Sequence, residues 1–470
     1  MRSLVVGGGA REHAIARTLA RDGSEVHVLA AHDNPGLRAV AHRFDVADHE
    51  DPALVASVAR RRKIELAVIG PEGPLAKGVA DALRGANVPV VGPSRDAARI
   101  ETSKRFCREL LARHGIDASP RFEFVESPDA VAAAVGRLGG PLVIKPVGLT
   151  AGKGVLVQGS DFATPEEGTR LASRMLASDS GRSGLLLEER LEGEEFSLMA
   201  LVTDSGVYPM PAVQDYKRAL EGGGGGNTGG MGSYSQRDHL LPFLAREHRD
   251  AALDVIRGTA SALRAEGLAF RGVLYGGFML TTKGPKLLEF NARFGDPEAM
   301  NALVLYEPGN FEELMYGVAT GTVDPNLVRY RPRATVVKYV VPIGYGGAPQ
   351  VGAVVDYDGP AIEDAGVHLF FASVDAAGAG KVRMLSSRGF ALVGEASAVW
   401  EASARVDAAL EFVKGSYYVR RDIGTREDVT RRTEHMRELF APGAKPSPLP
   451  LSVAAPTARP SSAGTADQVI

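Results

Sequence analysis

The residues best suited to chemistry lie between Leu287 and Met300, in the sequence LLEFNARFGDPEAM. We expect a strand here, followed by a turn and a helix. Side chains alternate along a strand, so Glu289 and Asn291 point to one face while Phe290 points to the other. A carboxylate and an amide oxygen on one face suit Mg²⁺, which takes a few protein oxygens and the rest from water and phosphates.

Two charged residues follow this strand in the turn. Arg293 comes two residues after Asn291 and offers a planar fork for a carboxylate or a phosphate. Gly295, Asp296 and Pro297 favour a turn, and a proline suits the first position of the helix that follows. In isolation, such a segment is more often a buried strand with capping residues, so the metal interpretation depends on the rest of the chain.

Three lysines are placed to neutralise phosphates. Lys104 opens a long helix, where the helix dipole disfavours a cation unless an anion lies nearby. Lys145 ends a strand that is buried by its pattern, and a buried lysine needs an anionic partner. Lys153 lies between Gly152 and Gly154 in PVGLTAGKGV, with a strand on either side. We expect a hairpin lid that closes over phosphates, although a solvated lysine is the usual reading of any one of them.

The segment LLLEERLEGEE suits a nucleoside. Backbone groups near Glu188 and Glu189 are placed to read an adenine edge, Leu191 to pack on it, and Glu195 to hold ribose hydroxyls. The alternative, an exposed acidic turn, has equal weight on sequence alone.

A substrate loop is expected between Ala212 and Ser235. Asp215, Lys217 and Arg218 precede a glycine run at 222–226 that we expect to be mobile. Asp215 is placed to hold an ammonium group. Donors with little side-chain bulk then come from Asn227, Thr228, Gly229, Gly230, Met231 and Gly232.

Glycines also follow the first predicted strand. Gly7 to Gly9 separate it from a helix pattern that starts at Ala10, which aims backbone N–H groups at an anion. The dinucleotide-binding pattern needs a third glycine where Glu12 stands, so NAD is disfavoured and a ribose-phosphate site remains.

Strands and helices alternate up to Gly92, with four expected strands, which predicts a parallel, doubly wound sheet. Ligands of such sheets lie beyond the carboxyl ends of the strands. Gly8, Gly9 and Glu72 all follow strand ends. Glu72 either holds a hydroxyl or amine of the ligand or only caps the next helix.

Composition excludes several classes of function. The 470 residues suggest roughly three domains, and the net charge of −3 gives no electrostatic footprint for nucleic acid or an anionic membrane. We expect no membrane span and no signal peptide. The single cysteine, Cys107, fits a reducing cytoplasm, where we expect the protein to act.

A third region begins near Arg333 with strand patterns and a helix. Arg420 and Arg421 stand near its end, where Arg421 either covers a substrate phosphate or belongs to a solvated run of charges. After about Pro442 the chain is rich in Pro, Ala and Ser, and we expect a disordered tail.

Taken in order, these motifs resemble the ATP-grasp superfamily, and more closely the phosphoribosylamine–glycine ligase family in its archaeal-like branch. The resemblance covers roughly residues 1–424. The motifs that carry it are GGGAREHA, GPEGPLAKGVAD, the Ser103–Lys104 pair, GLTAGKGV, NTGGMGSYS, LLEFNARFGDPE and RRDIG.

The resemblance implies an α/β and α+β multidomain fold. A doubly wound parallel-sheet domain for phosphoribosylamine spans 1–101. An ATP-grasp domain of two α+β subdomains spans 102–325, with a hairpin lid at about 121–192. A mixed, β-rich C-terminal domain spans 326–424, and a C-terminal extension spans 425–470.

It also implies an ATP-dependent carbon–nitrogen ligase of purine biosynthesis. Glycine and ATP give glycyl phosphate, and 5-phosphoribosylamine displaces phosphate to form glycinamide ribonucleotide. The cofactors are ATP with Mg²⁺ or Mn²⁺, and the partners are small substrates of a monomer or small homo-oligomer. The alternatives are an ATP-grasp ligase for another acid or amine, and a catalytically idle nucleotide-binding protein.

Residue roles follow from the resemblance. Glu289 and Asn291 hold the metal. The catalytic residues are Arg293, Asp296, Lys153 and Asp215. The ATP-binding residues are Lys104, Lys145, Gly152, Lys153, Gly154, Glu188, Glu189, Leu191 and Glu195. The substrate-binding residues are Gly8, Gly9, Arg11, Glu12, Glu72, Asp215, Lys217, Arg218, Asn227, Thr228, Gly229, Gly230, Met231, Gly232, Arg293 and Arg421.

Three positions depart from the family pattern. Val147 stands where the family has an aspartate, and Tyr216 stands where it has a histidine. Gly277 stands where archaeal relatives are expected to have a glutamine, which leaves metal binding to Glu289 and Asn291.

Overall fold

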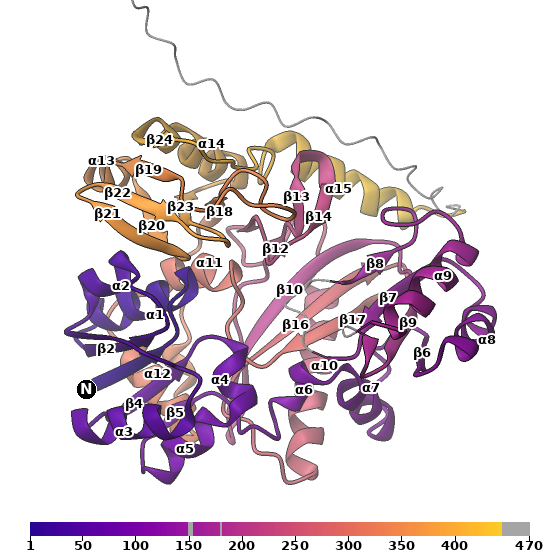
Figure 1. The fold of residues 1–470 in the computed structure, drawn as a ribbon, viewed down its shortest axis with the longest axis horizontal. Helices are drawn as coiled ribbons and strands as arrows, with labels where there is room; N and C mark the ends of the chain where they lie inside the picture. Colours follow the sequence, from indigo (N-terminus) through magenta and orange to yellow (C-terminus); the bar gives the residue numbers. More distant parts are fainter. Residues whose placement is uncertain (149–153, 179–180, 444–470) are drawn as a thin grey trace, which may run out of the picture.

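The protein is described here by a computed structural model that covers residues 1–148, 154–178 and 181–443. In Figure 1 the N-terminal domain (indigo and violet) and the C-terminal domain (orange and yellow) lie side by side, and the lid stands at the opposite end. A sheet of long strands runs between them. The expected α/β and α+β multidomain fold is confirmed.

The N-terminal domain is built around a parallel sheet. Its elements are β1 (Arg2–Val6), α1 (Ala10–Arg21), β2 (Glu25–Ala30), α2 (Pro35–Val40), β3 (Arg43–Val46), α3 (Pro52–Arg62), β4 (Leu66–Ile69), α4 (Glu72–Lys77), α5 (Val79–Gly85) and β5 (Val90–Val91). The strand order is β3-β2-β1-β4-β5, so the direction of winding reverses between β1 and β4. Gly8 lies in the loop after β1, and Glu72 begins the helix that follows β4. This reversal is where such sheets bind ligands.

The doubly wound parallel sheet is confirmed, with one strand more than expected. The extra strand, β3, reads RFDV and lies at the sheet edge, where its residues are only half buried or exposed. It therefore lacks the apolar run that identifies the central strands.

The lid is a four-stranded antiparallel sheet backed by two helices. Its elements are β6 (Phe122–Val125), α8 (Pro128–Leu138), β7 (Leu142–Pro146), β8 (Leu156–Val157), α9 (Pro165–Leu176) and β9 (Leu185–Glu189). The strand order is β6-β9-β7-β8. Apolar residues of both helices and of the strands form one small core.

The central part carries the strand that motivated the metal prediction. Its elements are α6 (Arg99–Thr102), α7 (Lys104–Arg113), β10 (Glu194–Val202), β11 (Val207–Pro209), α10 (Arg246–Ala265), β16 (Gly272–Thr281), β17 (Gly284–Asn291), α11 (Glu298–Leu305) and α12 (Phe311–Thr320). The sheet order is β11-β10-β16-β17, and α10 packs against all four strands. Since α11 packs on α1 and α12 on β4 and β5, this part also contacts the N-terminal domain.

The C-terminal part contains two further large sheets and the two-stranded sheet β13-β14. Its elements are β12 (Gln214–Asp215), β13 (Arg218–Leu220), η2 (Glu221–Gly223), β14 (Gly224–Asn227), β15 (Gly232–Ser235), η3 (Pro325–Leu327), β18 (Ala334–Val340), β19 (Val354–Tyr357), α13 (Gly359–Asp364), β20 (Val367–Phe371), β21 (Val374–Gly378), β22 (Lys381–Met384), β23 (Phe390–Ala396), α14 (Val399–Ala409), η4 (Leu410–Phe412), β24 (Val413–Gly415) and α15 (Arg426–Leu439). The sheet orders are β12-β15-β18-β23-β20 and β21-β22-β19-β24. The expected substrate loop thus supplies β12 and β15 to the larger sheet.

The glycine run expected to be mobile is instead a hairpin. β13 pairs with β14, and Gly222 and Gly223 between them have positive φ values of 69° and 80°. Glycine adopts such values without steric cost, so the run here serves a tight reversal of the chain. Residues 425–443 belong to the expected C-terminal extension, and most of them form the helix α15. The tail expected to be disordered lies almost entirely outside the described residues.

Within the part of the chain that the structure describes, no helix has both the length and the apolar character needed to cross a membrane.

Candidate active site

The end of β17 is shaped by a bulge. Gly277 on β16 pairs with Glu289, but the next residue, Phe278, pairs with Leu287, so Leu288 is an extra residue in β17. A bulge of this kind changes the direction of the side chains beside it. Two cations satisfy the Leu288 carbonyl: Arg108 Nη2 donates to it at 3.0 Å and Lys145 Nζ at 3.4 Å. The bulge therefore joins β17 to α7 and to the lid.

The alternation expected along β17 is observed. Phe290 is buried, whereas Glu289 and Asn291 on either side of it are only partly buried. Among the described residues, Glu289 makes no hydrogen bond or ion pair. Burial opposes its ionisation, yet Lys217, Lys145 and Lys104 nearby hold the pKa of Glu289 below its ordinary value. Glu289 is thus a carboxylate in a cationic setting without a partner of its own.

These residues fit a metal that is shared with phosphates. The Asn291 amide oxygen accepts a bond from Arg293 Nη2 at 3.1 Å, and it keeps a second lone pair. No group of three or more His, Cys, Asp or Glu side chains suited to a metal occurs in residues 1–148, 154–178 and 181–443. Mg²⁺ held by one or two oxygen ligands, with water and phosphate completing its shell, matches this donor set.

Arg293 lies between two carboxylates from other elements. Its Nε is 3.2 Å from Glu72 and its Nη2 is 3.3 Å from Glu101. Burial works against the charge on Glu72, but Arg293 and Arg11 outweigh it and lower the Glu72 pKa to about 2. Glu101 is more deeply buried, and burial raises its pKa to about 7 despite Arg293. One guanidinium keeps Glu72 ionised while Glu101 titrates near neutral pH.

The predicted phosphate-binding lysines converge near β17. Lys145 is buried and its Nζ lies 2.5 Å from Glu188. Lys104 Nζ donates to the Gly148 carbonyl at 3.1 Å, and burial lowers the Lys104 pKa although Glu289 opposes this. Lys153 and Gly152 lie outside the described residues.

Glu188 is occupied by protein side chains. Arg108 Nη2 donates to it at 2.6 Å, and Lys145 binds its other oxygen. Burial opposes its charge, but these two cations keep the pKa of Glu188 below its ordinary value. Its carboxylate is therefore satisfied within the protein.

Lys217 also lies near Glu289, and it interacts with Asp215. Lys217 Nζ lies 3.0 Å from Glu195, and Glu195 and Glu289 hold the Lys217 pKa well above its ordinary value against the effect of burial. Asp215 Oδ1 is buried, and no group in the part of the chain that the structure describes forms a hydrogen bond with it. Burial, with the nearby Glu298 carboxylate, raises the pKa of Asp215 well above its ordinary value.

The predicted glycine loop closes over Asp215. A β-carbon at Gly230 would lie 2.7 Å from Asp215 Oδ1, so only glycine fits there. Thr228 Oγ1 donates to the Lys217 carbonyl at 2.8 Å and accepts from the Gly230 N–H at 3.1 Å. Arg388 Nη1 donates to the carbonyls of Gly229 and Gly230. The same arginine lies 3.1 Å from Asp296. The predicted catalytic residue Asp296 therefore pairs with the arginine that binds this loop.

The start of α1 is less open to an anion than the sequence suggested. The Glu12 carboxylate accepts the Gly9 N–H and also pairs with Arg11. A carboxylate at a helix N-terminus takes the place that a phosphate would occupy. Arg11 Nη1 donates to the Phe294 carbonyl at 3.1 Å, which ties α1 to the turn after β17. Gly8 lies in the same loop, with His32 and Ala30 beside it.

Several predicted residues contact other groups. Glu189 pairs with Arg121 at 2.7 Å, and Arg218 pairs with Asp161 of the lid at 3.1 Å. Arg421 contacts Glu221 through its backbone N–H at 2.8 Å. Asn227 pairs with Arg218 across the β13–β14 hairpin, and Gly232 begins β15. Leu191 is half buried at the end of the lid, whereas Met231 is fully buried. Gly154 is the first described residue after the gap at 149–153.

Four charged side chains of the site were not predicted from the sequence. Arg108, Glu101, Glu298 and Arg388 are each linked to a predicted residue. Of the four, Arg108 had the clearest signal in the sequence, because it is a charged residue beside the apolar residues of RFCRELL. The others pair across distant segments, which a single sequence does not show.

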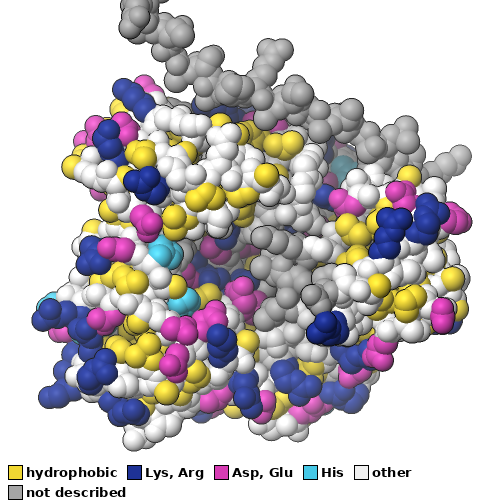
Figure 2. Space-filling model, in the orientation of Figure 1, with side chains coloured by type: hydrophobic (Ala, Val, Ile, Leu, Met, Phe, Trp, Pro, Cys, Tyr) yellow, Lys and Arg dark blue, Asp and Glu magenta, His cyan; other side chains and the backbone are white. Residues whose placement is uncertain are grey.

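In Figure 2 the molecule is hollowed between the N-terminal and C-terminal domains, with acidic and basic side chains in the hollow.

Comparison with known proteins points to one family. Models of phosphoribosylglycinamide synthetase match residues 1–101 (N domain) and 102–299 (ATP-grasp (A) domain). The phosphoribosylamine–glycine ligase of Thermococcus gammatolerans is 43% identical over 450 residues, which are 95% of this chain and 100% of the relative. That of Methanoregula boonei is 42% identical over 93% of this chain and 100% of its own.

Solved structures agree with this at the level of the fold. The phosphoribosylamine–glycine ligase of Thermotoga maritima superposes with a TM-score of 0.75 at 28% identity, covering 90% of this chain and 100% of its own. A biotin carboxylase domain from Hydrogenobacter thermophilus, solved with MgADP and bicarbonate, superposes with a TM-score of 0.69 at 15% identity over 94% of this chain and 98% of its own. At that identity the second likeness concerns the fold alone.

Proposed function

The chain belongs to the phosphoribosylamine–glycine ligase family and is an ATP-dependent carbon–nitrogen ligase, and we propose that it joins glycine to 5-phosphoribosylamine in the cluster around Glu289 and Asp215. The products are glycinamide ribonucleotide, ADP and phosphate, a step of purine biosynthesis. In this proposal phosphoribosylamine binds on the N-terminal domain and ATP binds between the lid and β17.

One observation carries the assignment of glycine. Asp215 Oδ1 is buried without a hydrogen-bond partner among the residues that the structure describes, which costs free energy unless a ligand supplies one. The ammonium group of glycine is a donor and a cation, so it removes both the desolvation cost and the missing bond. The tight packing at Gly230 leaves little room beside Asp215 and favours a small amino acid.

In the first step a glycine carboxylate oxygen attacks the γ-phosphorus of ATP. The bond from that phosphorus to the β–γ bridging oxygen breaks, ADP leaves, and glycyl phosphate forms. Lys104, Lys145 and Lys217 surround the Glu289 carboxylate and lie where negative charge is transferred. Such a reaction depends on positioning and charge neutralisation more than on a protein nucleophile.

Glu289 and Asn291 are the residues that would hold the metal. Bound Mg²⁺ or Mn²⁺ supplies charge neutralisation and fixes the phosphate oxygens. Arg293 holds Asn291 in place through its Nη2 and pairs with Glu72 of the N-terminal domain. The metal strand and the phosphoribosylamine domain are thereby linked by one side chain.

In the second step the amine nitrogen of phosphoribosylamine attacks the acyl carbon of glycyl phosphate. The carbon–oxygen bond to the phosphate breaks, phosphate leaves, and the nitrogen gives up one proton. Arg11 and Glu72 stand at the switch point of the N-terminal sheet, and Arg11 contacts the turn after β17. They are placed to orient the amine toward the acyl group.

The test is phosphate release from MgATP with glycine and freshly made phosphoribosylamine, each omitted in turn. We expect full release only when both are present, with a product of the mass of glycinamide ribonucleotide. Release that persists without glycine when another small acid is supplied would overturn the assignment of glycine.

A further inference from the structure

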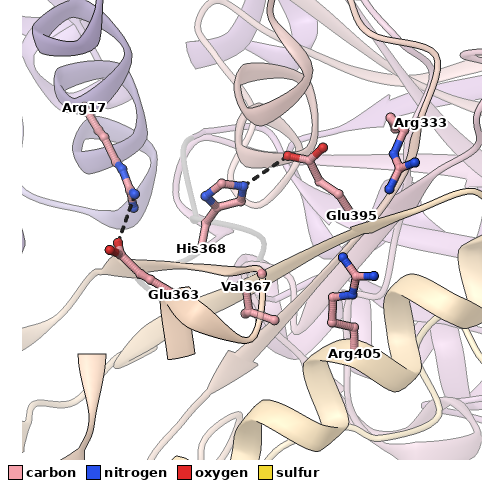
Figure 3. Close-up of a pocket in the computed structure, with 8 residues that line it drawn as sticks. Arg17, Arg333, Glu363, Val367, His368, Glu395 and Arg405 are labelled. Carbon is pink, nitrogen blue, oxygen red and sulfur yellow. Dashed lines mark hydrogen bonds and ion pairs between the residues drawn. The ribbon is translucent and has the colours of Figure 1, made fainter. Parts of the chain in front are cut away.

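A second polar pocket lies away from the cluster around Glu289. Its volume is about 320 Å³, and it is found where α1 of the N-terminal domain meets β20, β23 and α14 of the C-terminal domain (Figure 3). The charged residues and the histidine that line it are Arg17, Arg333, Glu363, His368, Glu395 and Arg405. None of them takes part in the contacts described for the candidate active site.

The acidic residues of this pocket are already neutralised. Glu395 lies 2.8 Å from Arg331 and 3.0 Å from His368, and its side chain is only 11% exposed. Glu363 pairs with Arg17 at 2.9 Å, which joins α13 to α1. Neither carboxylate is therefore left to balance the remaining arginines.

The other two arginines are not neutralised by any carboxylate of the described residues. Among the described residues, the guanidinium groups of Arg333 and Arg405 make no hydrogen bond or ion pair. Figure 3 shows the two groups pointing toward one another across the pocket. Two like charges repel in this arrangement, and an anion between them would remove the repulsion and pair with both groups.

The backbone leaves space for this arrangement. Gly366 has a φ of +73°, and a β-carbon there would lie 3.3 Å from Arg405 Nη1. A larger residue would be strained and would crowd the guanidinium. The arginine side chain thus rests against a position that only glycine fills without cost.

We propose that this pocket binds the phosphate group of a small phosphorylated metabolite, such as a sugar phosphate. Two planar guanidinium forks match the oxygens of a phosphate monoester, whose two negative charges balance the two unpaired arginines. A volume of about 320 Å³ leaves room for more than the phosphate itself and falls in the usual range of small-molecule pockets, about 300–1,000 Å³.

Calorimetric titration with ribose 5-phosphate, inorganic phosphate and ribose tests the proposal. The full-length protein is compared with an Arg333→Gln/Arg405→Gln variant and with Arg383→Gln, which removes an exposed arginine of the same domain outside the pocket. We expect one class of ribose 5-phosphate sites to weaken about tenfold or more in the double variant only. Binding at the substrate site remains in all three proteins.

Several outcomes would overturn the proposal. One is an equal loss of affinity for ribose 5-phosphate in Arg383→Gln, and another is equal binding of ribose 5-phosphate by the double variant and the wild type. Equal affinity for inorganic phosphate and ribose 5-phosphate would exclude the ester. If the double variant does not fold, the exposed Arg405→Gln change alone must weaken the same class of sites.

Discussion

Asp215 is predicted to lower the stability of the folded protein and to strengthen the binding of glycine. Its buried, unpartnered carboxylate has a pKa well above the ordinary value because of burial. The folded state therefore binds a proton at Asp215 more tightly than the unfolded state does. As pH rises from the unfolded pKa toward the folded one, stability falls, by about 1.4 kcal/mol for each pKa unit between them. At neutral pH, Asp215→Asn is expected to raise the free energy of unfolding.

The same change should weaken glycine binding. A charge-assisted hydrogen bond is worth roughly 1.5–3 kcal/mol, which corresponds to about a 10- to 150-fold increase in the KM for glycine. The KM for ATP should change little, because the lysines that surround Glu289 are untouched. Steady-state kinetics and urea unfolding of the same preparation measure both effects.

The matched control is Asp254→Asn, on the exposed face of α10, where the carboxylate pairs only with Arg257. It should leave stability and kinetics nearly unchanged. An Asp215→Asn protein that is less stable than wild type and keeps its glycine KM would refute the reasoning, because the carboxylate would then be a satisfied structural group.

Three further outcomes follow from buried polar groups. Arg108→Met leaves Glu188 short of a partner and should cost about 3–5 kcal/mol of stability, so an unchanged urea midpoint would contradict it. Burial raises the Glu101 pKa to about 7, so its ionisation lowers stability as pH rises from about 4.5 to 7. Glu101→Gln should therefore stabilise the protein at pH 8 but not at pH 4, as measured by urea unfolding at each pH. Tyr216→Phe removes the hydroxyl donated to Asp428 and should cost about 1.5–3 kcal/mol, and equal urea midpoints for variant and wild type would argue against that contact.

Short-range patterns predicted the elements that carry the chemistry. The alternation at Phe290 gave the face of β17 that holds Glu289, because the strand period is two residues. The glycines after β1 and the helix pattern from Ala10 located a loop of the N-terminal sheet in the same way. Parallel winding then placed that loop beside Glu72, since strand ends of such a sheet lie along one edge.

Contacts between distant segments could not be predicted from the sequence. Glu188 was expected to face a nucleoside, but Arg108 lies 80 residues away in the chain and satisfies its carboxylate. Glu12 was expected to face a phosphate, yet it folds back on the Gly9 N–H of its own helix. In both cases residue type gave the right chemistry, and packing decided which partner completes it.

The Tyr216 departure from the family pattern has a structural explanation of this kind. Its hydroxyl donates to Asp428 on α15, and its ring lies beneath the guanidinium groups of Arg420 and Arg432 at 5.0 and 4.6 Å. The helix α15, which the sequence pattern did not reveal, thus fixes the residue next to Asp215. A contact across more than 200 residues cannot be read from local periodicity.

The most direct test of the central claim is Glu289→Ala, with phosphate release and MgADP binding both measured. This change removes the only unpartnered carboxylate described on β17. It should reduce the rate of phosphate release at least about a hundredfold and abolish the Mg²⁺ dependence of ADP binding. Glu434→Ala, at an exposed position of α15, serves as the control and should behave as wild type. A folded Glu289→Ala protein that retains the wild-type rate and the Mg²⁺ dependence would contradict the account.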